Sequence, residues 1–335
     1  MLFTPTILVL GAGSWGTALA MVLARNGHQV ALWGRNSAQM QQMAATRQNA
    51  RFLPEITFPE NLHAVSDFVP YLSTVEDVLV VVPSHAFRET LALLAPHLAA
   101  KVRICWATKG LEYETGLLLH QVAADMLGKN RPLAVLSGPS FAMEVAKGLP
   151  TAVTVAANHT EYAELLVKKF HHHPSFRPYT SCDMVGVEVG GAVKNVIAIA
   201  AGIADGLGLG ANSRAALITR GLTEMVRFGT ALGGVRETFM GLAGLGDLVL
   251  TCTDNQSRNR RMGYALAQGQ TDSEAQAKIG QVVEGVHAAR EVYRLAQEME
   301  IAMPIVEHVH KVLEGEYTPQ AAVQALLSRA TTQEI

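Results

Sequence analysis

One lysine lies in an otherwise apolar stretch, and its surroundings predict an unusual proton affinity. Residues 187–202 are small or aliphatic except for Glu188, Lys194 and Asn195. Small residues let another backbone approach closely, so we expect a helix buried between two parts of the protein. Burial disfavours the ammonium form and lowers the pKa of a lysine, unless a carboxylate offsets it. A lysine tuned in this way exchanges a proton with a substrate near neutral pH.

A structural role for Lys194 fits this stretch equally well on its own. In that interpretation Lys194 pairs with Glu188 or a more distant acid, or extends from a helix end to water. A membrane span is not expected, because about 20 apolar residues without charge are needed. The motifs on either side of residues 187–202 decide between the two roles.

A glycine-rich turn near the N-terminus has the spacing of a dinucleotide-binding motif. Residues 6–10 form an aliphatic run typical of a buried parallel strand, and residues 17–24 read as a helix. In a GxGxxG turn the first glycine makes the turn, the second admits a pyrophosphate and the third allows close helix packing. The strand, turn and helix together predict a dinucleotide site. The turn supplies Gly11, Gly13, Ser14, Trp15 and Gly16.

The residue after the second predicted strand bears on the choice of cofactor. That strand spans residues 29–33, and Arg35 lies where NAD enzymes often carry Asp or Glu. An arginine there can pair with the 2′-phosphate of NADP(H), and no acid repels it. We therefore expect NADP(H) binding, with NAD(H) also accepted. The alternative is a solvated surface arginine.

Further aliphatic runs predict more strands of one open α/β sheet. Ligands bind at the carboxyl ends of the strands in such sheets, so Lys109, Gly138 and Ser140 are placed to meet cofactor or substrate. His85 is interpreted as an incidental loop histidine. The runs span residues 77–82, 102–107, 133–136 and 152–156.

Three adjacent histidines superficially look like a metal tract. Residues 160–170 predict a helix, and His171–His173 follow it directly. Adjacent histidines do not easily share one tetrahedral ion, and no Cys or acid lies beside them. We interpret them as a helix end and expect no metal.

After residue 180 the pattern changes from strands to helices. We therefore expect an α/β N-terminal Rossmann-type dinucleotide-binding domain over residues 1–184. An all-α C-terminal substrate-binding domain is expected over residues 185–335, with the lysine helix at its start. The helical periodicities cover residues 187–203, 213–232, 257–268, 285–298, 304–313 and 319–327.

Two polar segments of the second half have the composition of a ligand site. A glycine-rich bend over residues 241–246 ends at the carboxylate of Asp247. Ser257 can cap a helix whose free N–H groups lie beside Arg258 and Asn259, which makes an anion site suited to phosphate. The alternative is a capped, solvated basic helix face. The polar turn over residues 281–285 is expected to border the cofactor.

Composition bounds the remaining possibilities. The 335 residues predict about two domains, and 49% of them are hydrophobic. A net charge of −2 and a pI near 6.6 argue against a general nucleic-acid or membrane-surface binder. Three widely spaced cysteines indicate a reducing compartment. The apolar N-terminus lacks the basic region of a signal peptide, so a cytoplasmic protein is expected.

The motifs occur in a fixed order over nearly the whole chain. That series resembles the bacterial NAD(P)-dependent sn-glycerol-3-phosphate dehydrogenases. The resemblance implies a fold like that of 6-phosphogluconate dehydrogenase. It also implies reversible reduction of dihydroxyacetone phosphate to sn-glycerol 3-phosphate, which feeds phospholipid synthesis. The motifs are GAGSWGTALA, VVPSH, ATKGLE, SGPSFAMEV, GGAVKNVIAIAAG, TRGLTEM, GLAGLGDLVLTCT, QSRNRR and VVEG.

The resemblance also implies roles for individual residues. Lys194 would be the general acid and base. The substrate would contact Lys109, Gly138, Ser140, Lys194, Asp247, Ser257, Arg258 and Asn259. The cofactor would contact the Gly11–Gly16 turn, Arg35, Lys109, Ala142, Arg258, Val282 and Glu284. Family members differ at the Trp15 and Arg35 positions, so the cofactor preference is less firmly implied than the reaction.

The alternatives are a related enzyme and a protein of a different class. A related β-hydroxyacid dehydrogenase would share the two-domain plan and the lysine but would need a carboxylate site in place of the phosphate site. A non-catalytic NADP sensor would keep GxGxxG without a desolvated lysine. A small phosphorylated substrate, no nucleic acid partner and a homodimer are expected.

Overall fold

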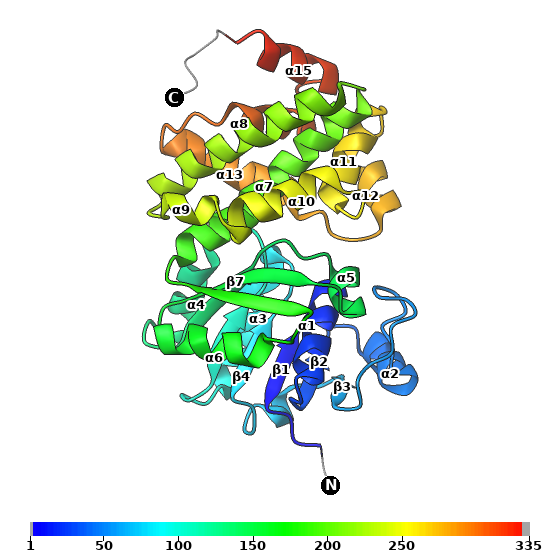
Figure 1. Ribbon diagram of the computed structural model, residues 1–335, viewed down its shortest axis with the longest axis vertical. Helices are drawn as coiled ribbons and strands as arrows, with labels where there is room; N and C mark the ends of the chain where they lie inside the picture. The colour runs from blue at the N-terminus through cyan, green and yellow to red at the C-terminus, as the bar shows by residue number, and fades with distance from the viewer. Residues whose placement is uncertain (1–2, 330–335) are drawn as a thin grey trace.

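An eight-stranded sheet forms the N-terminal half of the protein (Figure 1). The computed structural model describes residues 3–329. All neighbouring strands are parallel except β6 and β7, which are antiparallel. The order turns back between β1 and β4, which is the position where open α/β sheets bind ligands. Across the sheet the strands are β3 (Leu62–Val65), β2 (Val30–Trp33), β1 (Ile7–Leu10), β4 (Asp77–Val80), β5 (Arg103–Trp106), β6 (Leu133–Ser137), β7 (Thr151–Ala157) and β8 (Phe176–Ser181).

Helices cover both faces of this sheet, which explains its aliphatic strands. One core joins the sheet to α1, α2, α5 and α6, and a second joins it to α3 and α4. Strands buried on both faces require apolar side chains at successive positions, as in the four-residue β1. These helices are α1 (Ser14–Arg25), α2 (Ser37–Thr46), α3 (Phe87–Leu94), α4 (Leu119–Leu127), α5 (Ala142–Lys147) and α6 (Thr160–Phe170). The 3-10 turns are η1 (Val69–Tyr71), η2 (Ser84–Ala86) and η3 (Ala95–His97).

The C-terminal half is helical and is organised around one long central helix. Figure 1 shows α7 rising from the sheet into the middle of the other helices. A third apolar core surrounds it. The elements are α7 (Met184–Gly206), α8 (Gly210–Ala231), α9 (Arg236–Phe239), the π-helical turn η4 (Leu242–Gly246), α10 (Asp247–Thr253), α11 (Arg258–Ala267), α12 (Asp272–Ile279), α13 (Glu284–Glu298), α14 (Pro304–Leu313) and α15 (Pro319–Leu327).

Small residues on α7 allow other backbones to touch it, as the sequence predicted. A Cβ on Gly190 would lie 2.4 Å from the carbonyl oxygen of Ala243, and one on Gly202 would lie 1.9 Å from that of Arg260. Within residues 3–329, α7 is the helix whose length and hydropathy would suffice to cross a membrane, but its apolar window is wholly buried inside the protein. It is the core helix of the helical half.

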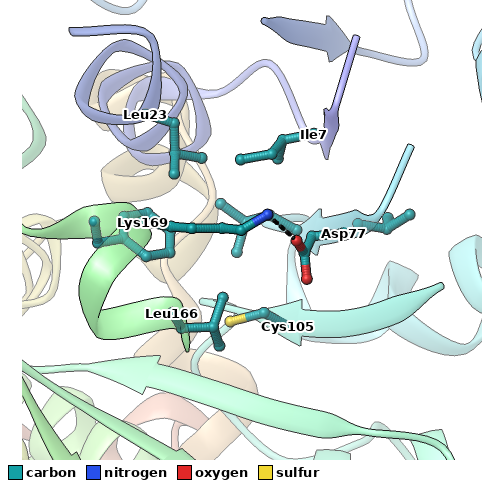
Figure 2. Close-up of a pocket in the computed structure, with 9 residues that line it drawn as sticks. Ile7, Leu23, Asp77, Cys105, Leu166 and Lys169 are labelled. Carbon is teal, nitrogen blue, oxygen red and sulfur yellow. Dashed lines mark hydrogen bonds and ion pairs between the residues drawn. The ribbon is translucent and has the colours of Figure 1, made fainter. Parts of the chain in front are cut away.

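A buried charge cluster lies at the amino end of the sheet, away from the predicted site. Lys169 Nζ contacts Asp77 Oδ2 at 2.7 Å and Glu76 Oε2 at 3.1 Å. Arg103 Nε contacts Asp77 Oδ1 at 2.8 Å, so the cluster holds two cations and two carboxylates. Figure 2 shows Lys169 reaching Asp77 between apolar side chains. The small pocket there is lined by Ile7, Leu23, Asp77, Val78, Leu79, Cys105, Leu166, Lys169 and Phe170.

The fold class is confirmed, and most predicted elements are present. Residues 304–313 and 319–327 are helical with the predicted bounds. The outer ends of both predicted domains lie outside the described residues. The prediction missed β3, β8, α2, α3, α4, α5, α9, α10 and α12. It also gave no sign that β7 runs antiparallel to β6.

The missed strand β8 has a physical explanation. It alternates buried and exposed positions and contains Pro178, which cannot donate to a neighbouring strand. Such a sequence is typical of a sheet edge, and β8 is the outermost strand beside β7.

Candidate active site

Two lysines share one buried carboxylate where the sheet meets the helical half. Lys194 Nζ donates to Asp247 Oδ1 at 2.6 Å, and Lys109 Nζ donates to Asp247 Oδ2 at 2.7 Å. Lys194 comes from α7, Asp247 begins α10, and Lys109 follows β5 at the carboxyl edge of the sheet. Asp247 is 1% exposed. This arrangement brings together three of the predicted site residues.

The cluster has one more cation than anion, which sets its proton affinity. Burial lowers the pKa of Lys194 to about 7, and the positive charge of Lys109 adds to this, while Asp247 opposes it. Burial by itself would raise the pKa of Asp247, but the two lysines hold it below its usual value. The carboxylate is therefore ionised, and Lys194 can gain or lose a proton near neutral pH.

Of the two kinds of acid considered as structural partners of Lys194, the structure shows the distant one, Asp247, and not Glu188. The ion pair expected for a structural role is therefore present. Glu188 lies on the same helix but accepts hydrogen bonds from Trp106 Nε1 and from the backbone N–H of His120. Its second oxygen lies 2.6 Å from His120 Nδ1. Lys194 instead also donates to Thr251 Oγ1 at 3.0 Å. Thr251 was not predicted, although it lies one helical turn after Asp247.

The loop after β6 completes one wall of the cluster. The carbonyl oxygen of Gly138 accepts from Lys109 Nζ at 3.2 Å and from Ser140 Oγ at 2.8 Å. Gly138 has φ +146°, and a Cβ there would lie 3.0 Å from Val153 Cα. Only glycine fits this turn. The structure therefore places Gly138 and Ser140 beside Lys109, as expected.

The start of α11 has the geometry predicted for an anion site. Ser257 precedes α11, and its side chain accepts from the backbone N–H of Arg260, which confirms the predicted cap. Burial lowers the pKa of Arg258, although Glu284 opposes this shift. Arg258 Nη1 donates to Gln281 Oε1 at 3.2 Å. The first residue of α11 therefore carries a guanidinium, and the first turn of the helix has backbone N–H groups without helical partners.

Asn259 has a different set of contacts from the one expected. Its side-chain nitrogen donates to Asn195 Oδ1 at 2.7 Å, and its oxygen accepts from the backbone N–H of Gly285 at 2.9 Å. The amide therefore links α11, α7 and α13. Asn195, which was not predicted, is the next residue after Lys194. The side-chain oxygen of Asn195 accepts one of the two hydrogen bonds of this link. A polar residue within an apolar stretch is the sequence signal that could have identified it.

The Gly11–Gly16 turn has the shape of a pyrophosphate cradle. Gly11 has φ +122°, and a Cβ there would lie 2.3 Å from the carbonyl oxygen of Val81. A Cβ on Gly16 would lie 1.9 Å from the carbonyl oxygen of Gly11, whereas one on Gly13 would meet nothing within 4 Å. Gly13 therefore leaves open space before the N-terminus of α1. These glycines fit the three roles predicted for a dinucleotide motif.

The remaining predicted cofactor residues lie on several elements of both halves of the protein. Trp15 packs against the core, and its Nε1 is buried without a hydrogen-bond partner. Arg35 is exposed after β2, and Asn36 beside it caps α2 by accepting from Gln39 N. The last three positions are Ala142, which begins α5, Val282, which is exposed, and Glu284, which begins α13.

The histidines lie outside this cluster. His85 lies in η2, with its ring 5.8 Å from that of His287 on α13. α6 ends at Phe170, which confirms that His171 begins the segment after the helix. Within residues 3–329, no group of three or more His, Cys, Asp or Glu is arranged to hold a metal ion.

A Rossmann-type sheet, joined to a helical half by a helix that carries a buried lysine, defines a class: the two-part NAD(P)-dependent dehydrogenases. Two family models cover the chain. The NAD-dependent glycerol-3-phosphate dehydrogenase N-terminus matches residues 6–163, and the C-terminus of the same family matches residues 183–324. The chain belongs to the NAD-dependent glycerol-3-phosphate dehydrogenase family.

Individual relatives agree with this assignment. Glycerol-3-phosphate dehydrogenase [NAD(P)+] of Pseudoalteromonas translucida is 56% identical over 97% of this chain and 97% of its own length. The glycerol-3-phosphate dehydrogenase structure from Coxiella burnetii is 53% identical, with a TM-score of 0.94 over 98% of this chain and all of that one. The yeast glycerol-3-phosphate dehydrogenase structure is 27% identical, with a TM-score of 0.82 over 96% of this chain and 99% of that one.

Proposed function

We propose that the protein catalyses the reversible NAD(P)H-dependent reduction of dihydroxyacetone phosphate to sn-glycerol 3-phosphate, a precursor of glycerophospholipids. The observation that carries this proposal is the Lys109–Asp247–Lys194 cluster, which joins the carboxyl edge of the sheet to α7 and α10. Membership of the glycerol-3-phosphate dehydrogenase family supports the same reaction.

Lys194 is the proposed general acid of the reduction. The Gly11–Gly16 turn would hold the pyrophosphate of a dinucleotide whose nicotinamide would supply a hydride to the carbonyl carbon of the substrate. Negative charge would then develop on the carbonyl oxygen. The ammonium of Lys194 stabilises this charge and transfers its proton to the oxygen. With a pKa of about 7, the neutral lysine also serves as the base in the reverse reaction.

Asp247 and Lys109 are proposed to prepare Lys194 for this role. Asp247 holds the ammonium in one orientation through a 2.6 Å contact. Lys109 neutralises the same carboxylate from its other oxygen at 2.7 Å. The surplus positive charge of the cluster favours an anionic substrate and a developing alkoxide.

The proposed phosphate site is the start of α11. Arg258 and the free N–H groups after Ser257 supply hydrogen-bond donors and a favourable helix dipole. Asn259 contributes its backbone there, because its side chain is engaged with Asn195 and Gly285. A β-hydroxyacid substrate would lack the phosphate that this site fits.

We also propose that residues 1–184 and 185–335 are the two functional domains, with the cofactor bound by the first. Arg35 is proposed to contact the 2′-phosphate of NADP(H), with NAD(H) also accepted. A cytoplasmic homodimer is the proposed state of the enzyme. Cell fractionation and light scattering of the purified protein test this last statement.

The main test follows the loss of reduced-nicotinamide absorbance in the presence of dihydroxyacetone phosphate. Parallel assays use NADH in place of NADPH, and unphosphorylated dihydroxyacetone as the matched control. Oxidation that requires the phosphorylated ketone supports both the reaction and the phosphate site. Absence of turnover with either cofactor would contradict the proposal.

A further inference from the structure

A buried hydrogen bond joins two segments 200 residues apart at the edge of the candidate site. Ser84 Oγ donates to Glu284 Oε2 at 2.9 Å. Ser84 begins η2, in the turn after β4, and Glu284 is the first residue of α13. Ser84 is 4% exposed. The bond therefore ties the sheet to the helical half.

The backbone that carries Lys109 passes directly beside this pair. Gly110 follows Lys109, and a Cβ on Gly110 would lie 3.0 Å from Ser84 Oγ and 3.6 Å from Glu284 Oε2. Gly110 also has φ +133°, which favours glycine. Ser84 and Glu284 are thus packed against the turn that directs Lys109 towards Asp247.

The charge of Glu284 also interacts with Arg258 on α11. Burial raises the pKa of Glu284, while the hydrogen bond from Ser84 and the positive charge of Arg258 on α11 lower it in part. The same attraction opposes the effect of burial on Arg258. The other titratable groups at this boundary are His85 beside Ser84 and His287 on α13, whose rings lie 5.8 Å apart.

We propose that Ser84 is a positioning residue for the reaction. Its hydroxyl fixes the Glu284 carboxylate, and with it the start of α13 and the guanidinium of Arg258, between the cofactor and the phosphate. This inference rests on the proposed function, because it assigns Ser84 a task in that same site. A buried carboxylate that loses a hydrogen-bond donor binds a proton more readily, so its attraction for Arg258 weakens.

The kinetic test compares Ser84→Ala with Ser84→Thr, which keeps a hydroxyl. We expect Ser84→Ala to raise the KM for dihydroxyacetone phosphate and NADPH about ten-fold, the effect of one hydrogen bond to a charged group. The kcat should change less than about two-fold, because Lys194 and Asp247 are untouched. Ser84→Thr should restore most of the affinity. Thr90→Ala is the matched control, because the Thr90 hydroxyl is buried and donates to Ala86 O within the same part of the sheet domain.

A second measurement follows the protonation of the Glu284 carboxyl group directly and does not depend on catalysis. Carboxyl carbon NMR titration, assigned by the signal lost in Glu284→Gln, should show the Glu284 midpoint rising about one pH unit in Ser84→Ala. The effect of Ser84→Ala on KM should vanish when Glu284→Gln is already present. If Ser84→Ala does not fold, Ser84→Cys replaces it, because a thiol is a weak donor.

Two results would overturn the inference. One is an unchanged Glu284 midpoint in Ser84→Ala, and the other is an equal rise in KM with and without Glu284→Gln. A wild-type protein that does not reduce dihydroxyacetone phosphate would refute the proposed function instead. The titration would then still decide whether Ser84 controls Glu284.

Discussion

Lys169–Asp77 and Lys194–Asp247 are lysine–aspartate pairs with both side chains at most 10% exposed, and they differ in the charges around them. Lys169 and Asp77 lie at the amino end of the sheet with Arg103 and Glu76, so two cations face two carboxylates. Lys194 and Asp247 lie beyond the opposite end, where Lys109 adds a cation without a second carboxylate. The N–O distances within the two pairs are nearly equal, at 2.7 and 2.6 Å.

The two pairs thus have similar contacts and differ in the balance of charge around them. Burial raises the pKa of Asp77, but the hydrogen bonds of Arg103 and Lys169 more than reverse this, so Asp77 stays ionised. At the other cluster burial lowers the pKa of Lys194 to about 7, and the positive charge of Lys109 adds to this shift while Asp247 opposes it. The surplus cation of this cluster also leaves room for the negative charge of a substrate.

The first prediction removes the lysine of the Lys194–Asp247 pair. Lys194→Met should lower kcat by about 100- to 10,000-fold, because the proton donor for the carbonyl oxygen is lost. Steady-state assays with NADPH and dihydroxyacetone phosphate measure this, with Lys168→Met as an exposed lysine control. Retention of most of the turnover in Lys194→Met would show that Lys194 is not the acid.

The second prediction removes the lysine of the Lys169–Asp77 pair. Lys169→Met should lower the free energy of unfolding by about 2 kcal/mol, because a hydrogen bond to a buried charge is lost while Arg103 still holds Asp77. Urea unfolding measures this, and kcat should remain near the wild-type value. Lys194→Met should not lower the free energy of unfolding, since burial disfavours its charge. Equal destabilisation by both substitutions would remove the distinction.

The third prediction sharpens the comparison through pH. Lys194 is protonated below its pKa of about 7 and neutral above it. The kcat/KM for ketone reduction should therefore fall about ten-fold per pH unit above pH 7, while that for glycerol 3-phosphate oxidation should rise through the same pH. Lys169→Met should show the same two profiles. Flat profiles between about pH 6 and 9 would argue against proton transfer by Lys194.

The fourth and smallest effect concerns anion binding. Inorganic phosphate at about ten times its Kd should stabilise the wild type by about 1.4 kcal/mol, through the start of α11. Lys169→Met should be stabilised equally, and Arg258→Met should not. Thermal unfolding at matched ionic strength with chloride measures the difference. Equal stabilisation of Arg258→Met would place the phosphate elsewhere.

Much of the site could be predicted because its residues break local patterns. Lys194 interrupts an apolar helix, and the Gly11–Gly16 turn interrupts a strand–helix unit. Ser257 precedes a helix and caps it. Each of these signals depends on residues close together in the sequence, where spacing reports geometry directly.

The rest depends on contacts between distant segments. The Glu188 partner His120 lies 68 residues away, and the Asn259 partner Asn195 lies 64 residues away. No local pattern distinguishes Glu188 from Asp247 as the partner of Lys194. The antiparallel direction of β7 is likewise set by how the chain returns along β6, and not by the composition of residues 151–157.

The glycine contacts of α7 fix the direction in which the side chain of Lys194 points. Gly190 touches the Ala243 carbonyl one turn before Lys194, and Gly202 touches the Arg260 carbonyl about two turns after it. Inserting one residue between Gly190 and Lys194 would turn the lysine by about 100° relative to the first contact. A change in the length of α7 between these contacts would therefore redirect the lysine even if every side chain were kept.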